Sequence, residues 1–230
     1  MAELTIALAV FVGTHFLLSH PLRAPLVRAI GAGAFQGLYS LVALATFGWA
    51  IFAFRRVPAT EPYWLASEGL WIAATFIMLI ASILLVGSFF GNPALPQPGA
   101  AKLAAAPARG VFAITRHPMM WSFALWALAH ALVAPNQATL ILCGFVAFLA
   151  LVGAAGQDHK KAVVMGEGWR DWASRTSYWP FGLQLGERSS WREAWPGRTI
   201  VLGGIALWLV ASWVHPLLGV PAAGPWHWLG

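Results

Sequence analysis

The sequence has few charged residues and almost no cysteine. Of its 230 residues, 14 are Lys or Arg and 8 are Asp or Glu, so 10% of the chain is charged, against roughly 25% in soluble domains. That is too little charge to cover a soluble surface. The single cysteine, Cys143, excludes an intrachain disulfide framework, a CxxC zinc site and the CxxCH attachment of c-type haem. The net charge of +6 is explained by basic loops that face lipid headgroups, without invoking nucleic acid.

What the sequence does contain is a set of long apolar runs without Asp, Glu, Lys or Arg. Roughly 20 helical residues cross the hydrocarbon of a bilayer, and 59% of this chain is apolar. Six uncharged runs reach or approach that length: residues 4–19, 36–54, 69–90, 118–135, 137–155 and 199–218. We therefore predict a single all-α domain over residues 1–230. It is expected to be a polytopic membrane bundle of about six transmembrane helices with short interfacial helices.

The basic residues of the connecting segments predict the orientation of these spans. The connections on one side carry 12 Lys and Arg, whereas the other side carries two, Arg55 and Arg56. The side richer in Lys and Arg is usually cytoplasmic, so both termini are expected outside. The start, Met1-Ala2-Glu3, has no basic flank and no small-residue cleavage site follows the first run, which is therefore expected to remain in the mature protein. Membrane lipid is an expected partner and nucleic acid is not.

Two connections are longer than a hairpin needs. Residues 91–109 contain four prolines, which oppose a regular helix and favour a surface or re-entrant loop. Residues 156–198 mix seven basic residues with seven aromatic ones, a combination favoured at lipid headgroups. We expect one or two short helices along the inner leaflet there, which either cover a cytoplasmic cavity or only anchor the bundle.

Three of the seven histidines fall within or near the end of an apolar run: His15, His130 and His215. An ionisable side chain in hydrocarbon is costly, so a functional partner or a structural interhelical hydrogen bond is expected for each. For His215, beside Pro216 near the interface, the structural role is favoured. At a rise of about 1.5 Å per residue, His15 and His130 lie roughly 8 and 16 Å above the same membrane boundary. Their imidazoles are thus close enough in height to hold a flat ring between them.

Two imidazoles on opposite faces of a porphyrin hold haem b without a covalent bond to the protein. Zinc fits less well, because the spans contain no carboxylate and one thiol. The residues that share the helical face of His130 are expected to contact a cofactor held there, with plain packing or lipid contact as the alternative. They are Met119, Phe123, Trp126 and Ala127.

The segment Arg116-His117-Pro118 opens the fourth run at the membrane edge. The guanidinium of Arg116 can form a two-pronged bond to a carboxylate or phosphate, and His117 can donate or accept beside it. Pro118 suits the first turn of a helix, where no backbone donor is needed. Arg116 and His117 are therefore candidate cofactor-binding residues, although composition alone favours an interfacial anchor followed by a helix-starting proline.

The longer motifs resemble those of one family of bacterial integral membrane proteins. They are THFLLSHPLRAPLVRAIGAGAFQGLYSLVALA, GVFAITRHPMMWSFALWALAHALVAPN and GQDHKK. Together they resemble the NnrU family over residues 1–182. That family takes its name from an association with nitrate and nitrite respiration. It is similar to plant 15-cis-zeta-carotene isomerase, a multispan enzyme that holds haem b between two histidines and isomerises a carotenoid double bond after iron reduction frees a coordination position.

The resemblance implies a location in the bacterial inner membrane and a set of site residues. His130, in the segment WALAH, matches the second haem histidine of the isomerase, and His15 matches the first. His20 and His117 remain alternatives as ligands. Arg23, in the Leu-Arg pair that follows the first histidine, is a further candidate for cofactor binding.

A second resemblance is to membrane isoprenylcysteine and phospholipid methyltransferases, whose RHP histidine and later glutamates hold S-adenosylmethionine. The Arg-His-Pro segment and the later glycine, tryptophans and aromatic-proline pair carry this similarity. The chain departs from that pattern at Met120, where a tyrosine is usual, and at Gln157-Asp158, near the position of the acidic pair. It also departs from the isomerase at Ala127, where the isomerase has a cysteine, so chemistry that depends on that thiol is in doubt.

These resemblances imply three functions. The first is a haem b-binding membrane protein that acts as a redox-gated cis-trans isomerase of a hydrophobic polyene such as zeta-carotene, with an unknown redox partner. The second is a non-catalytic haem or electron-transfer accessory in denitrification. The third is a membrane methyltransferase that uses S-adenosylmethionine, Arg116 and His117.

Overall fold

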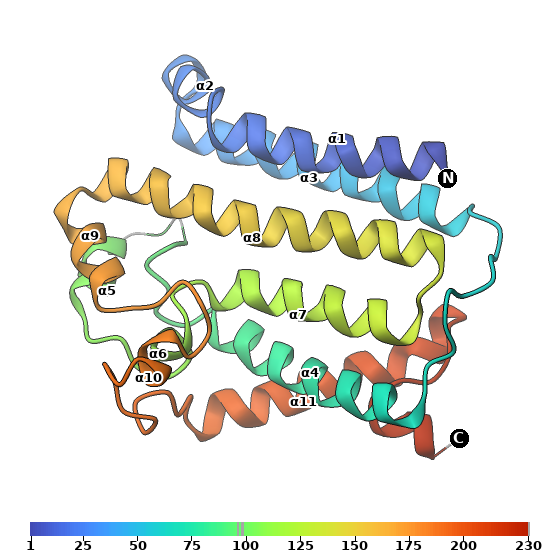
Figure 1. Ribbon diagram of the computed structural model, residues 1–230. Coiled ribbons are helices and arrows are strands. Elements are labelled where there is room, and N and C mark those ends of the chain that lie inside the picture. The colour runs from blue at the N-terminus through green and yellow to red at the C-terminus, as the bar shows by residue number, and fades with distance from the viewer. Residues whose placement is uncertain (96, 98, 230) are drawn as a thin grey trace.

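The computed structural model describes residues 1–95, 97 and 99–229, and the regular secondary structure among them is helical (Figure 1). No strand occurs among these residues, so the predicted all-α class is confirmed. In chain order the elements are α1 (Ala2–Ser19), α2 (Arg23–Ile30), α3 (Ala32–Arg55), α4 (Glu68–Gly87), α5 (Ala100–Ala105), α6 (Val111–Ile114), α7 (Pro118–Val133), α8 (Gln137–Met165), α9 (Glu167–Ser174), α10 (Gly182–Leu185), α11 (Arg198–Val214), η1 (His215–Leu218) and η2 (Gly224–Trp228).

Among the described residues, five helical segments are long and apolar enough to cross a membrane: α1, α3, α4, α8 and the segment Arg198–Leu218, which α11 and η1 form together. The predicted span 118–135 is instead the shorter helix α7, whose 16 residues extend about 24 Å. α7 ends at Val133 because Pro135 follows and disfavours helical backbone at the residue before it. The protein is therefore a multi-pass membrane protein.

The long helices lie side by side in one bundle (Figure 1). α8 lies between α1 and α7, and α1 pairs with α3 at one edge of the bundle. α4 packs against both α7 and α11. Both ends of the chain lie at one end of the bundle, whereas α2, α5, α6, α9 and α10 lie at the other.

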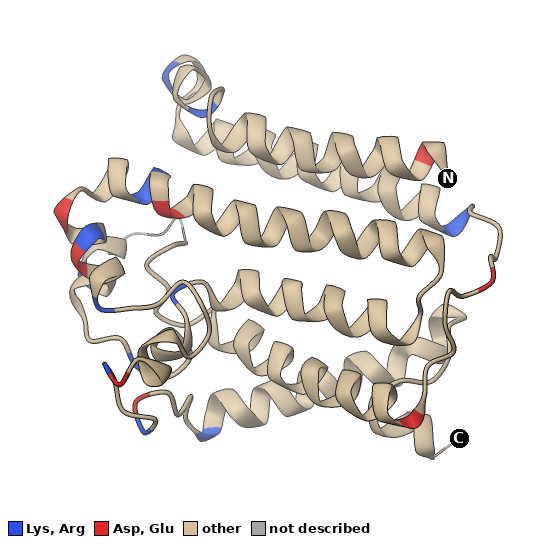
Figure 2. Ribbon diagram, in the orientation of Figure 1, with Lys and Arg blue, Asp and Glu red and all other residues tan. Residues whose placement is uncertain are grey.

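Charged residues gather at the ends of the bundle and are absent from the middle of its long helices (Figure 2). Most of the Lys and Arg lie at the end that carries the short helices. Between the ends, large apolar side chains face outward, such as Leu41 and Leu44 of α3, which are 65% and 68% exposed. A surface of this kind is suited to lipid tails rather than to water.

Helix α8 begins and ends at clear local signals. The side chain of Asn136 accepts a hydrogen bond from the backbone N–H of Thr139 at 3.0 Å and caps its first turn. The helix continues ten residues past the predicted end of the span at residue 155, and stops where Gly166 adopts φ +57°. This extension carries Asp158 beyond the uncharged run to the end of the bundle where basic residues gather.

The segment 91–109 is more ordered than its prolines suggested. Pro96 and Pro98 lie outside the described residues, but residues 100–105 form the helix α5. These six residues form a helix because they are proline-free and rich in alanine, the best helix former. Among the described residues no helix runs through the whole segment, as predicted.

The segment 156–198 contains the end of α8 and two short helices, α9 and α10, where one or two short helices were predicted. Two of its tryptophans differ from the expected headgroup belt. Trp169 and Trp172 are 1% and 2% exposed and belong to a buried apolar cluster, where the ring of Trp172 lies 6.1 Å from that of Phe112. Their spacing of three residues places both indoles on the inner face of α9, whereas Trp179, Trp191 and Trp195 are exposed.

Candidate functional site

The most extensive polar site of the described structure lies where the short helices gather and is centred on Asp158 of α8. Arg116, just before α7, donates from Nε to Oδ1 and Oδ2 of Asp158 at 3.0 and 2.9 Å, and from Nη2 to Oδ2 at 2.6 Å. The side chains are only 15% and 20% exposed. The two-pronged bond predicted for Arg116 therefore forms, and its carboxylate belongs to the chain itself.

His117 takes part in the same site. Its Nε2 lies 2.9 Å from Oδ1 of Asp158, and its Nδ1 lies 3.2 Å from Oε1 of Gln157. Both ring nitrogens thus have partners, and the side chain is fully buried. A metal ligand needs a free nitrogen lone pair, so this arrangement favours a structural role for His117.

The loop after α9 closes this site. Thr115 Oγ1 and Trp121 Nε1 both donate to the backbone carbonyl of Tyr178, at 2.7 and 2.8 Å. The hydroxyl of Tyr178 donates to the carbonyl of Leu151 on α8 at 2.6 Å. The start of α7, the end of α8 and this loop are therefore joined by one hydrogen-bond network, which we call the Asp158 network (Thr115, Arg116, His117, Trp121, Gln157, Asp158 and Tyr178).

The carboxyl of Asp158 is held in its charged form. Burial raises its pKa, but the hydrogen bonds from His117 and Arg116 and their nearby charges outweigh burial, so the pKa lies below its ordinary value of 3.8. The ion pair therefore stabilises the fold at any pH above that ordinary value, and this contribution is lost as the pH falls through the lowered pKa.

The three histidines of the apolar segments share a different pattern. In each, Nδ1 lies 2.8 Å from the carbonyl oxygen of the residue four positions earlier in the chain. A bond to a carbonyl places the ring proton on Nδ1 and leaves a lone pair on Nε2, as in most metal-bound histidines. The three residues are His15, His130 and His215.

The neighbours of these histidines decide which of them can act together. His15 packs against Phe11 and against Tyr39 of α3, with ring centroids 4.4 and 5.5 Å apart. His130 faces His215, with centroids 6.2 Å apart and ring planes at 25°. Because α8 lies between α1 and α7 (Figure 1), the structure does not bring His15 and His130 together. Haem binding between His15 and His130 therefore remains a prediction from the sequence.

The other predicted cofactor-binding residues are spread along the bundle. Trp126 lies against His130, with ring centroids 4.1 Å apart, and Ala127 is buried. Phe123 is 41% exposed, and Met119 lies eleven residues before His130, which is roughly 16 Å along the helix. The guanidinium of Arg23 lies at the other end of the bundle, 5.9 Å from the ring centroid of Phe35. Only Trp126 and Ala127 are thus beside His130.

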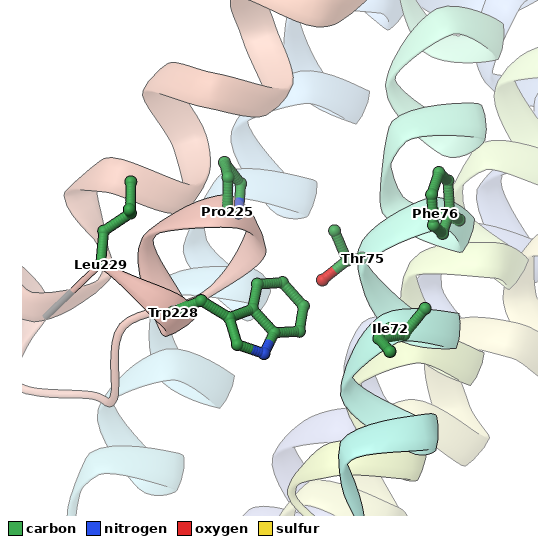
Figure 3. Close-up of a pocket in the computed structure, with 6 residues that line it drawn as sticks. All are labelled: Ile72, Thr75, Phe76, Pro225, Trp228 and Leu229. Atoms are coloured by element: carbon green, nitrogen blue, oxygen red, sulfur yellow. The ribbon is translucent and has the colours of Figure 1, made fainter.

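An apolar groove of about 510 Å³ lies at the end of the bundle opposite the Asp158 network (Figure 3). It opens between α4 and η2. Its one hydroxyl, Thr75 Oγ1, is buried and has no hydrogen-bond partner among the described residues. A mainly apolar lining of this kind suits an apolar molecule. The lining residues are Ile72, Thr75, Phe76, Pro225, Trp228 and Leu229.

Sequence reasoning missed two residues of these sites. Asp158 was noted only as a departure from a methyltransferase motif, and His215 was given a structural role. The signal for Asp158 was an acidic residue just past an apolar run, among basic residues of the same membrane edge. For His215 no sequence signal pointed to His130, because the two meet only through the packing of α7 and α11 on α4.

His20 provides a pH-dependent contribution that can be measured. Burial, and then the positive charges of Lys160 and His159, lower the pKa of His20 below its ordinary value of 6.5. The unfolded chain therefore binds this proton more readily, and stability falls as the pH drops below 6.5. We expect the melting temperature in detergent to fall between pH 7 and pH 5, and to fall less in His20→Asn. His227→Asn, at the other end of the bundle, is the control, and an equal fall in all three proteins would contradict this prediction.

These features define a multi-pass α-helical membrane protein with a polar network at one end of its bundle and histidines inside it. The chain belongs to the NnrU family, since the family model described as NnrU protein matches residues 3–222. No curated protein and no solved structure matches this chain. The family match covers all five candidate spanning segments and α7.

Proposed function

We propose that this NnrU protein binds haem b and that His130 and His215 would hold its iron. The observation that carries the proposal is the proximity of two imidazoles whose Nδ1 atoms are each bonded to a carbonyl, with ring centroids 6.2 Å apart and ring planes at 25°. Two imidazoles on one metal, with bonds of about 2 Å, place their ring centres about 6 Å apart. The donor chemistry and the spacing of this pair therefore suit the iron of haem b.

The surroundings of His130 also suit this role. The indole of Trp126 lies against its ring and the small side chain of Ala127 is buried beside it. The bond from Nδ1 of His130 to the carbonyl of Trp126 fixes the direction of the ring and increases the basicity of Nε2. When bound, haem b would supply a redox-active iron that can also act as a Lewis acid.

The substrate we propose is a hydrophobic polyene, and the reaction is its redox-gated cis-trans isomerisation. The groove between α4 and η2 supports an apolar ligand, because five of its six lining residues are apolar and it lies at the same end of the bundle as His130 and His215 (Figure 1). Expression in a carotenoid-producing host that lacks zeta-carotene isomerase tests this reaction. An unchanged ratio of cis to trans products with haem-loaded protein would favour the non-catalytic electron-transfer function.

The haem proposal is tested by the visible spectrum of detergent-purified protein, oxidised and reduced, after expression with added haem. We expect a Soret band that shifts on reduction, and haem content below about a tenth of the wild-type value in His130→Ala and in His215→Ala. His227→Ala, whose ring stacks on Trp71, is the control and should keep its haem. Loss of haem in His15→Ala but not in His215→Ala would instead support the pair predicted from the sequence, His15 and His130. A colourless wild-type protein would overturn haem binding itself.

A further inference from the structure

Two basic side chains from distant parts of the chain, Arg23 and Lys160, lie close enough for their charges to repel each other. Arg23 is the first residue of α2, and Lys160 lies on the extension of α8. Burial lowers the pKa of the Lys160 ammonium, and the nearby charge of Arg23 lowers it further. The carboxylates in ion pairs among the described residues are Asp158, Glu167 and Asp171, and none of them pairs with Arg23 or Lys160.

His20 brings a third nitrogen group to the same place. Its ring lies directly on α8, because a Cβ added at Gly156 would be 2.6 Å from Nε2. Gly156 is one helical turn before Lys160, so the imidazole and the ammonium share one face of α8. Among the described residues, neither ring nitrogen of His20 has a hydrogen-bond partner.

Neighbouring Lys161 differs from Lys160 and marks the limit of this cluster. Its ammonium donates to the carbonyls of Pro93 and Leu95, at 3.0 and 3.5 Å. Its hydrogen bonds are therefore satisfied within the protein, whereas those of Lys160 have no partner within the described chain. The unsatisfied cluster comprises His20, Arg23 and Lys160.

The position of the cluster favours a lipid as the source of the missing anion. His20 directly follows the apolar helix α1, and Lys160 lies three residues past the uncharged part of α8, which ends at Gln157. The helix that carries Arg23 is flanked by exposed apolar side chains, since Leu22 and Ile30 are 42% and 45% exposed. A short helix with exposed apolar residues beside basic ones is typical of the headgroup region.

We propose that His20, Arg23 and Lys160 bind the phosphate of an anionic lipid headgroup. The guanidinium can give two parallel N–H donors to one phosphate, and the ammonium adds a point charge. The imidazole supplies a further donor once the anion offsets the positive charges around it. The occupied site joins α2 to α8, two helices that the chain separates by more than a hundred residues.

Native mass spectrometry of delipidated protein with added phosphatidylglycerol or phosphatidylcholine tests this site. We expect wild-type protein to retain phosphatidylglycerol in preference to phosphatidylcholine. Each charge removed should weaken that retention roughly fivefold, so Arg23→Gln with Lys160→Gln should weaken it more than tenfold. Gly156→Ala, which displaces the His20 ring without changing charge, should also weaken it, whereas Lys102→Gln, an exposed lysine of the same end, should not.

A melting experiment without lipid separates binding from structure. The double variant removes both like charges and with them their repulsion, so its melting temperature without lipid should be equal to or higher than that of wild type. A lower value would assign these residues to the fold and overturn the site. The site would also be overturned if wild-type protein retained phosphatidylglycerol and phosphatidylcholine equally. It would be overturned as well if wild type and the double variant retained phosphatidylglycerol equally. Displacement of phosphatidylglycerol by millimolar inorganic phosphate would show that the site takes a soluble phosphate, against the lipid assignment.

Discussion

Asp158→Asn is expected to destabilise the protein by about 3 kcal/mol, the order of magnitude for removing one partner of a largely buried ion pair. The substitution keeps the size of the side chain but leaves the guanidinium of Arg116, 15% exposed, without its charged partner. It also removes the negative charge beside His117, which lies 2.9 Å away. The free energy of unfolding, measured by SDS titration in mixed micelles, is the readout.

A second aspartate gives a matched control for this experiment. Asp171 forms an ion pair with Arg175 one turn later on α9, but the two side chains are 61% and 35% exposed. Asp171→Asn is expected to cost less than about 1 kcal/mol, because exposed pairs contribute little. If the two variants were equally stable, the Asp158 network would not be what joins α7, α8 and the following loop.

The helical bundle could be predicted from sequence because charge and hydrocarbon are incompatible. Uncharged runs marked five of the helices that can span a membrane, and the sixth run marked α7. The ends of the helices were harder to predict. An uncharged run says where a helix can lie in lipid, but α8 continues into charged sequence until Gly166, and α7 stops before Pro135. Helix ends depend on local backbone signals more than on hydropathy.

For the candidate sites, the sequence predicted what individual side chains can do but not which residues they meet, and the physical reason differs between the sites. The chemistry of Arg116 and His117 toward a carboxylate follows from the side chains themselves. The identity of that carboxylate does not, because Asp158 lies 42 residues away and reaches Arg116 only through the extension of α8. His15 and His130 were paired only because they are expected at similar distances from one membrane boundary. That distance does not tell which helices are neighbours, and α8 lies between the helices that carry these two histidines.

Gly204→Ala is expected to destabilise the protein by about 3 kcal/mol, the upper part of the usual cost of overpacking. Gly204 of α11 lies so close to α4 that an added Cβ would be 2.7 Å from the Cα of Ile83 and 2.9 Å from its backbone nitrogen. A backbone cannot rotate away as a side chain can, so the two helices must separate. Small residues at such crossings allow close packing of membrane helices, and separation would also move His215 away from His130.

Gly48→Ala, in the middle of α3, provides the control for this prediction. Nothing lies within 4 Å of a Cβ added there, so the substitution should be neutral or stabilising by up to about 1 kcal/mol, through the higher helix propensity of alanine. Both variants add one methyl group to an apolar helix, and they differ only in what that group meets. A Gly204→Ala protein as stable as wild type would show that α11 does not cross α4 at this residue. The proximity of His130 and His215 depends on that crossing. The proposal that these two residues bind haem would then lose its support.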